Sequence, residues 1–398
     1  MNRNLSKLFE IAQKPTRRII GLMSGTSMDG LDVALCKIEG SGLQTQLKIE
    51  QFETVSFKEE IKEEIRRVFA KKEIDFQYLC LLNPWIGQLH GQIVLDCLQK
   101  WGIQPTEIDL IASHGQTVFH APKILHQNPT FANATLQIGD GDHLAVTTGI
   151  ITLSDFRQKH CAAGGEGAPL AVYGDYFLFS QKGENRIMLN MGGIANFTYL
   201  PGSLNAHEVF VTDTGPGNTL LDAFMRKFYH LPYDEDGKLS ASGKVHSELL
   251  NCLKKEPFFN APFPKTTGPE LFNLEYVRRA QQRSGTTSLA PEDMMATLTR
   301  FSAETIAEAI LKVCDKNKSY RLYLSGGGMH NPILIRDLHL LLPDFLMANT
   351  DTLGIAGDAK EAVLFAILAN ETVAGDRLDF GDRERVPSVT MGKISFPH

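Results

Sequence analysis

Residues 18–35 read RIIGLMSGTSMDGLDVAL. Two apolar runs flank a turn of small and acidic residues, a pattern typical of strand, tight turn and strand. Gly25, Thr26 and Ser27 allow backbone amides and hydroxyls to approach an anion closely, and Asp29 and Asp32 can hold a metal-bound water. We therefore interpret the segment as a β-hairpin that cradles phosphate groups. A P-loop would instead join a strand to a helix with the pattern GxxxxGKS or GxxxxGKT, which this chain lacks.

A second segment of the same design follows about half a chain later, where residues 186–200 read RIMLNMGGIANFTYL. Its apolar run, glycine turn and second apolar run repeat the first architecture, which indicates an internal duplication. A third glycine-rich turn, SGGG at 325–328, follows an apolar strand. A single turn of this kind often only permits a positive φ angle. Three in this order, with Asp213-Thr214-Gly215 between the last two, indicate a nucleotide bound between two α/β domains.

Length and composition limit the classes of protein to consider. A chain of 398 residues has room for two or three domains, and a net charge of −6 argues against nucleic acid as the main partner. Residues 1–17 lack the apolar core of a signal peptide, and no run of about 18 apolar residues suggests a membrane span. Six scattered cysteines without CxxC pairs are typical of buried thiols. We expect a cytoplasmic protein that associates with neither membranes nor nucleic acid.

Hydrophobic periodicity places the remaining elements. Residues 58–100 are expected to be helical, and a short strand at 108–112 is expected to end in a polar turn at 113–117. A strand at 209–212 should be followed by a turn at 213–218. Further helices are predicted from Thr219, from Pro291, from Pro332 and over roughly 358–370.

Asp213 is the candidate general base, because it follows an apolar strand and precedes Gly215-Pro216-Gly217, where a ligand can approach the backbone. The structural alternative is a helix N-cap.

Ser113, His114 and Gln116 offer hydrogen bonds to a sugar, or else form an ordinary polar turn.

Arg157 can meet a substrate carboxylate in a bidentate way, or pair with Asp155 or Glu166. Glu361 either faces the site or lies on a solvated helix face. No HExxH or paired-ligand spacing occurs, so no resident metal is predicted. Magnesium is expected to arrive with the nucleotide, because phosphoryl transfer needs its charge.

These motifs together resemble the anhydro-N-acetylmuramic acid kinases, which belong to the sugar kinase/Hsp70/actin-like superfamily. The resemblance extends over nearly the whole chain in family order. Its matches are GLMSGTSMDGLD at 21–32, SHGQT at 113–117, QIG at 137–139, DFR at 155–157, GGEGAPL at 164–170, NMGGIAN at 190–196, DTGPGN at 213–218 and SGGG at 325–328.

The resemblance implies an α/β fold of two duplicated actin-like (ribonuclease H-like) domains, with a nucleotide and substrate cleft between them. One domain would comprise residues 1–185 plus about 358–398, and the other residues 186–357. The enzyme would hydrolyse the 1,6-anhydro bond of 1,6-anhydro-N-acetylmuramic acid and phosphorylate O6 from ATP. Its product would be N-acetylmuramic acid 6-phosphate, in peptidoglycan recycling. The family is typically dimeric, so a homodimer is expected.

The resemblance also assigns roles to residues. Asp213 would activate the attacking water, and Mg²⁺ would lie with ATP near Asp29 and Asp32. ATP would contact Ser24, Gly25, Thr26, Ser27, Met28, Asp29, Gly30, Leu31, Asp32, Gly192, Gly193, Asn196, Gly326, Gly327 and Gly328. The amino sugar would contact Ser113, His114, Gln116, Arg157, Gly215, Asn218 and Glu361.

Three positions depart from the family pattern: Glu166 where Gln is common, His160 where an acid is common, and Pro269 where Arg is common. None of them touches Asp213 or the first turn, so the activity is retained as the prediction. Two alternatives stay open. One is an actin-like kinase for another sugar or acyl substrate, and the other is a nucleotide-binding regulator without catalysis.

Overall fold

The computed structural model describes residues 2–26, 28–381, 383 and 386–398. The chain divides into two compact units. Unit 1 comprises Met1–Phe179 and Gly354–His398, and unit 2 comprises Ser180–Leu353. Unit 2 is therefore an insertion in the chain of unit 1. The breaks predicted from the sequence, after residue 185 and near 358, lie close to these positions.

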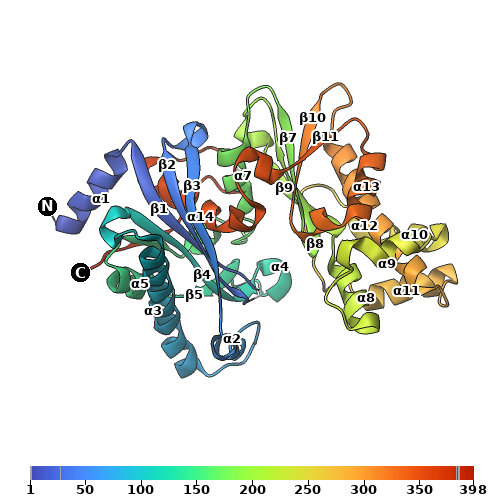
Figure 1. The fold of residues 1–398 in the computed structure, drawn as a ribbon, viewed down its shortest axis with the longest axis horizontal. Coiled ribbons are helices and arrows are strands. Elements are labelled where there is room, and N and C mark those ends of the chain that lie inside the picture. The colour runs from blue at the N-terminus through green and yellow to red at the C-terminus, as the bar shows by residue number, and fades with distance from the viewer. Residues whose placement is uncertain (1, 27, 382, 384–385) are drawn as a thin grey trace. The chain divides into compact units, whose positions relative to one another are not determined.

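Unit 1 is built on a mixed sheet, which counts seven strands within the described chain (Figure 1). Its main path runs β3-β2-β1-β4-β6-β12, and β5 pairs with β4. The first three strands are antiparallel, whereas β1, β4 and β6 are parallel. The strands are β1 Thr16–Ser24, β2 Gly30–Glu39, β3 Gln46–Ser56, β4 Leu110–Ala121, β5 Ala134–Ile138, β6 Thr152–Ser154 and β12 Lys393–Ser395.

Unit 2 repeats this order in the five strands that the described residues form, β9-β8-β7-β10-β11 (Figure 1). The β7–β8 and β8–β9 pairs are antiparallel, and β10 lies parallel to both β7 and β11. The strands are β7 Asn185–Met191, β8 Ile194–Leu200, β9 Phe210–Pro216, β10 Tyr320–Ser325 and β11 Leu346–Asn349. The common order of a three-stranded meander followed by two parallel strands is the actin-like arrangement in each unit, so the predicted fold class and duplication are confirmed.

The described residues of unit 1 form eight α-helices, several of which contact its sheet. They are α1 Arg3–Gln13, α2 Glu59–Arg66, α3 Phe76–Trp101, α4 Lys123–His126, α5 Gly141–Thr148, α6 Phe156–Ala162, α7 Ala171–Phe179 and α14 Lys360–Ala374. Helix α14 is buried from Ala362 to Glu371 and packs over β1, β2 and β4. The approach is very close at Gly21, because a Cβ there would lie 1.9 Å from the carbonyl oxygen of Ala362. This glycine fixes the start of α14 against the end of the first hairpin.

Helix α12 organises the core of unit 2. Its first half packs with α8, α10 and α11, and its second half covers the sheet. The helices are α8 Thr219–Tyr229, α9 Lys238–Ser242, α10 Ser247–Leu253, α11 Leu274–Ser284, α12 Pro291–Val313 and α13 Pro332–Leu341. The predicted starts at Thr219, Pro291 and Pro332 are confirmed.

Two predicted turns prove to be strand. The segment SHGQT lies inside β4, which runs to Ala121, because β5 pairs with it and extends the sheet. Gly115, at φ +75°, accommodates the irregular register there. Likewise β9 continues through Asp213 to Pro216, since β8 pairs with it along this length. The predicted turn at 213–218 is thus reduced to its last residues.

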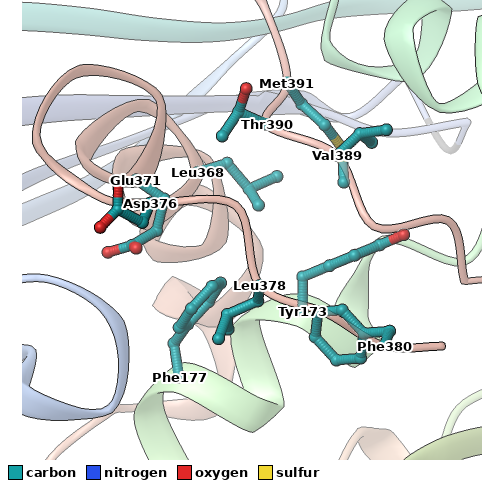
Figure 2. A pocket seen from close by; sticks show the side chains of 10 residues that line it. All are labelled: Tyr173, Phe177, Leu368, Glu371, Asp376, Leu378, Phe380, Val389, Thr390 and Met391. Atoms are coloured by element: carbon teal, nitrogen blue, oxygen red, sulfur yellow. The ribbon is translucent and has the colours of Figure 1, made fainter. Parts of the chain in front are cut away.

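Two stretches that follow α14, at 376–380 and 389–391, pack against α7 and α14. Figure 2 shows Tyr173 and Phe177 of α7, with Leu368 of α14, facing side chains of these stretches. The Tyr173 hydroxyl donates to the Pro387 carbonyl oxygen at 2.7 Å. The cavity among these groups has a volume of about 20 Å³. It is large enough for a single water molecule, so we do not regard it as a ligand site.

Within the described residues, no helix has both the length and the apolar character that a membrane span requires.

We expect Gly21→Ala to destabilise unit 1. The added methyl group must displace the backbone of α14 at Ala362, and such overpacking costs about 1–3 kcal/mol. Urea unfolding followed by circular dichroism measures the loss. Gly357→Ala is the matched control, because a Cβ at Gly357 meets no atom within 4 Å. Equal stability of the two variants would show that α14 does not depend on this contact.

Acid should weaken the fold through His90 of α3. Its ring is fully buried against Phe57, neither nitrogen has a hydrogen-bond partner among the described residues, and burial lowers its pKa to about 4. The unfolded chain therefore takes up this proton near pH 6.5 while the folded chain resists it. Stability is then lost as the pH falls from about 6.5 towards 4. Between pH 7 and 5 the loss from this group is about 2 kcal/mol.

The measurement is urea unfolding at both pH values, compared with His90→Leu. The variant should lose about 2 kcal/mol less than the wild type between pH 7 and 5. His143→Leu, at an exposed position on α5, serves as the control. An identical pH dependence of wild type and His90→Leu would contradict the prediction.

Candidate functional site

The β1–β2 turn in unit 1 is held from beneath by Gln116 of β4. The Ser24 hydroxyl lies 2.6 Å from Gln116 Oε1, to which it donates, and Gln116 Nε2 donates to the Gly25 carbonyl oxygen at 3.0 Å. Both side chains are buried. A buried side-chain amide thus fixes both the strand end and the first residue of the turn, and the turn presents its outer residues to solvent.

The exposed groups of this turn are Thr26 and Asp29, whereas Leu31 belongs to the hydrophobic core. The part of Leu31 that can meet a ligand is therefore its backbone. Met28 has a left-handed conformation, with φ +59°, and packs partly on the core. Ser27, which the sequence assigned to the phosphates, lies outside the described residues.

Carboxylates gather where β2 begins and α14 begins. Partial burial raises the pKa of Asp32, a hydrogen bond from the Thr54 hydroxyl opposes this, and the charge of Asp358 adds to it. The Glu361 side chain is exposed, yet protein atoms surround much of its carboxylate, and the resulting desolvation raises its pKa. The charge of Arg157 lowers the pKa of Glu361, and the charge of Asp32 raises it. Carboxylates of Asp32, Asp358 and Glu361 thus lie near one another, with the cations Arg157 and Lys360 beside Glu361.

This donor set fits a magnesium ion that is delivered with phosphates. Mg²⁺ keeps several waters and usually takes only one or two protein carboxylates, and Asp29 and Asp32 can provide them. Among the described side chains, no group of three or more His, Cys, Asp or Glu is arranged to hold a metal ion by itself.

His114 is a structural neighbour of the turn rather than an exposed group. Its Nδ1 donates to the Gly115 carbonyl oxygen at 2.8 Å, and its Nε2 accepts from Arg157 Nε at 2.8 Å. Burial and the Arg157 charge hold the pKa of His114 well below its usual value. The ring packs on Phe365 of α14. Ser113 is also buried and accepts from the Gly115 amide. Sugar contacts by Ser113, His114 and Gln116 stay predictions, since all three side chains are bonded within the protein.

Arg157 links this cluster to the loop at 164–167. Its Nη1 donates to the Gly167 carbonyl oxygen at 2.7 Å, and the Gly167 amide donates to His160 Nδ1 at 2.9 Å. In the described structure Arg157 forms no hydrogen bond with Asp155 or Glu166; Asp155 pairs with Lys393 instead. His160, the departure from the family pattern, therefore anchors the loop that supports Arg157.

In unit 2, the β7–β8 turn is joined to the start of α8. The Gly193 carbonyl oxygen accepts from the amides of Gly217 and Thr219 at 2.8 and 3.0 Å, and the Gly192 carbonyl oxygen accepts from the Asn218 amide at 2.9 Å. A Cβ at Gly217 would lie 2.3 Å from the Gly192 oxygen. Only glycine allows this approach.

The third glycine-rich turn completes the same cluster. Gly326 has φ +81°, and a Cβ there would lie 2.5 Å from Asn190 Oδ1. A Cβ at Gly328 would lie 2.7 Å from Met191 Cβ, and one at Gly327 would lie 3.6 Å from Asn218 Nδ2. Unit 2 thus brings together the second hairpin, the DTGPGN segment and the SGGG turn, which lie far apart in the sequence.

Asp213 lies within β9, beside this cluster and half-buried. The Thr267 amide donates to its Oδ2 at 2.8 Å, and its own amide donates to the Lys265 carbonyl oxygen at 2.9 Å. Asn196 pairs with it across β8 and β9. Asp213 is not a helix cap, because the N-cap of α8 is Asn218. Sequence reasoning missed Thr267 and Lys265 as its neighbours; the segment 265–270 drew notice only for Pro269.

A family model described as anhydro-N-acetylmuramic acid kinase matches residues 17–379. The chain belongs to this family. A relative of that name from Pseudoalteromonas atlantica is 56% identical over the full length of both chains. Others from Pseudoalteromonas translucida and Caldanaerobacter subterraneus are 52% and 37% identical, and cover 100% and 98% of this chain and 100% of their own. The family resemblance inferred from the motifs is confirmed.

Solved structures align more loosely. Component A of (R)-2-hydroxyglutaryl-CoA dehydratase from Acidaminococcus fermentans is 10% identical, with a TM-score of 0.41 over 90% of this chain and 99% of its own. A likeness this weak adds nothing to the strand order and the family membership.

We expect Gln116→Leu to weaken nucleotide binding selectively. The change removes both hydrogen bonds that fix Ser24 and Gly25, which costs about 1–2 kcal/mol and lets the turn relax. The dissociation constant for Mg-ATP should rise about tenfold in calorimetry. Gln92→Leu, at an exposed position on α3, is the control. Unchanged affinity in Gln116→Leu would mean that the first turn does not contact the nucleotide.

Proposed function

We propose that this chain is an ATP-dependent anhydro-N-acetylmuramic acid kinase. It hydrolyses the 1,6-anhydro bond of 1,6-anhydro-N-acetylmuramic acid and phosphorylates O6, which yields N-acetylmuramic acid 6-phosphate and ADP in cell-wall recycling. Membership of the family over residues 17–379 carries the proposal. The carboxylate of Asp213, which accepts a hydrogen bond from the Thr267 amide and lies next to the glycine-rich segments of unit 2, supports this proposal.

Asp213 acts as the general base. It takes a proton from the water that attacks the anomeric carbon, the bond between that carbon and the bridging oxygen breaks, and the released oxygen attacks the γ-phosphate of ATP. The hydrogen bond from the Thr267 amide favours the ionised carboxylate. A base held in this way starts the reaction in the required protonation state.

The glycine-rich turns bind the nucleotide. The β1–β2 turn and Gly192, Gly193 and Asn196 lie against the phosphates, and Gly326–Gly328 lie beside the nucleoside. Asp29 and Asp32 hold Mg²⁺, which neutralises phosphate charge when it is bound. The grouping of Asp32 with Asp358 and Glu361 supports this assignment.

The amino sugar contacts Arg157, Glu361, Gly215 and Asn218, as the resemblance implies. The Arg157 guanidinium is held by His114 and Gly167, so a substrate carboxylate would meet a cation of fixed orientation.

A homodimer and a cytoplasmic location complete the proposal. Exposed apolar side chains on α3 support self-association, since Phe76 and Leu81 are 75% and 61% exposed. Sedimentation velocity of the full chain tests this, and a monomer at micromolar concentration would refute it.

The decisive experiment combines purified protein, Mg-ATP and 1,6-anhydro-N-acetylmuramic acid, with mass spectrometry of the sugar. We expect the sugar to gain one water and one phosphoryl group. Asp213→Asn should retain ATP binding but lose roughly 10²–10⁴-fold in kcat, as removal of a general base does. Asp236→Asn, at an exposed position, should behave as wild type.

Other results separate the alternatives. Turnover of a different sugar only would keep the kinase and change its substrate. ATP binding without turnover of any sugar would favour a regulator. Near-normal turnover by Asp213→Asn would remove Asp213 as the base.

A further inference from the structure

Lys265 is a buried cation in unit 2, close to Asp213. Its residue is 7% exposed, and its ammonium donates to the carbonyl oxygens of Phe258 and Phe259 at 2.8 and 3.2 Å. Three aromatic rings surround it. The Nζ atom lies 4.4 Å from the ring centre of Phe258, 5.1 Å from that of Phe263 and 5.9 Å from that of Phe259. The mechanism proposed above does not use this residue.

The backbone of Lys265 is joined to the strand that carries the base. Its carbonyl oxygen accepts from the Asp213 amide at 2.9 Å, and its own amide donates to the Thr212 hydroxyl oxygen at 3.0 Å. Two residues further on, the Thr267 amide donates to Asp213 Oδ2. The position of that amide relative to the carboxylate therefore depends on where the segment at Lys265 lies.

The side chain of Lys265 also connects this segment to Phe259, which supports the end of β9 at Gly215. The ring of Phe259 lies against Gly215, where a Cβ would be 2.9 Å from Phe259 Cε1. Lys312 of α12 also donates to the Phe259 carbonyl oxygen, at 2.8 Å. Lys265 thus connects Phe259, which packs on Gly215, with Thr267, which holds Asp213.

Burial of this ammonium is unfavourable. Desolvation, with a smaller contribution from the charge of Lys312, lowers the pKa of Lys265 to about 8. An apolar side chain of similar length would fill the space among the three rings without that penalty. What an apolar residue cannot supply is the pair of hydrogen bonds to the Phe258 and Phe259 carbonyl oxygens.

We propose that Lys265 is a positioning residue for the reaction: it holds the 258–267 segment so that the Thr267 amide stays on the Asp213 carboxylate. This rests on the proposed function, in which Asp213 is the base. Without Lys265 the amide moves away, the ionised carboxylate loses a hydrogen bond, and the base becomes harder to ionise and less well oriented.

Lys265→Met is the main test, with Lys318→Met, at an exposed position in the same unit, as the matched control. We expect Lys265→Met to lower kcat by roughly 10–100-fold, while the KM for Mg-ATP changes less than about threefold. The acid limb of the kcat/KM profile should move up by about one pH unit, because the base has lost a hydrogen bond to its charged form. In Lys265→Arg, the acid limb of the kcat/KM profile should lie close to its wild-type pH.

A double variant separates positioning from general damage. In the Asp213→Asn background, Lys265→Met should cause little further loss, because both changes act on one group. Lys265→Gln, whose shorter side chain keeps an amide donor group, is measured in parallel; if Lys265→Met does not fold, it should show a smaller change in kcat and in the acid limb, in the same direction.

Three outcomes would overturn the inference: wild-type kcat in Lys265→Met, an unmoved acid limb, or an equal loss in the two backgrounds. Full activity of Asp213→Asn would instead remove Asp213 as the base, and no turnover of 1,6-anhydro-N-acetylmuramic acid by the wild type would refute the proposed function. The two failures are therefore distinguishable.

Discussion

The first turn of α8 depends on two carbonyl groups of the β7–β8 hairpin. Helix N-termini leave backbone amides without intrahelical partners. Here Gly192 and Gly193 accept from two of them, those of Asn218 and Thr219, and Gly193 also accepts from Gly217, just before the helix. The bonds form only because Gly217 brings its backbone against the hairpin. The start of the helix, the hairpin and the end of β9 are therefore joined by hydrogen bonds, and Asp213 and Asn218 lie on these joined elements. The SGGG turn then packs on the outer side of the same hairpin, at Asn190 and Met191.

The two hairpins occupy equivalent places in duplicated sheets but are stabilised differently. Backbone carbonyls of the second accept from a helix start, whereas a buried side-chain amide, Gln116, supports the first. The first turn therefore keeps exposed residues, Thr26 and Asp29, and stands beside carboxylates. In the proposed function both turns bind phosphates, but only the first stands beside carboxylates that can hold the metal.

Much of this architecture could be predicted from the sequence. The alternation of apolar runs with glycine turns at 18–35 and 186–200 predicted both hairpins, and Pro291 and Pro332 marked helix starts correctly. The segment SHGQT was misjudged because its polar residues suggest a turn, although its buried side chains hydrogen-bond to backbone atoms of the segment and to Ser24 and Arg157. Hydrophobic periodicity does not reveal that polar side chains are hydrogen-bonded inside the protein. Lys265 was missed for a related reason: a lone lysine among phenylalanines has no motif, and its carbonyl and ring partners become neighbours only through folding.

The insertion of unit 2 into unit 1 also orders the events of synthesis. Residues 180–353 leave the ribosome as one continuous stretch, so unit 2 has all of its strands and helices before residue 354 is made. Unit 1 at that stage lacks α14, the helix that lies over β1, β2 and β4 and is buried from Ala362 to Glu371. Its central sheet must wait with an uncovered apolar face while the inserted unit is translated. We therefore expect nascent unit 1, rather than unit 2, to be the part of this chain that chaperones engage.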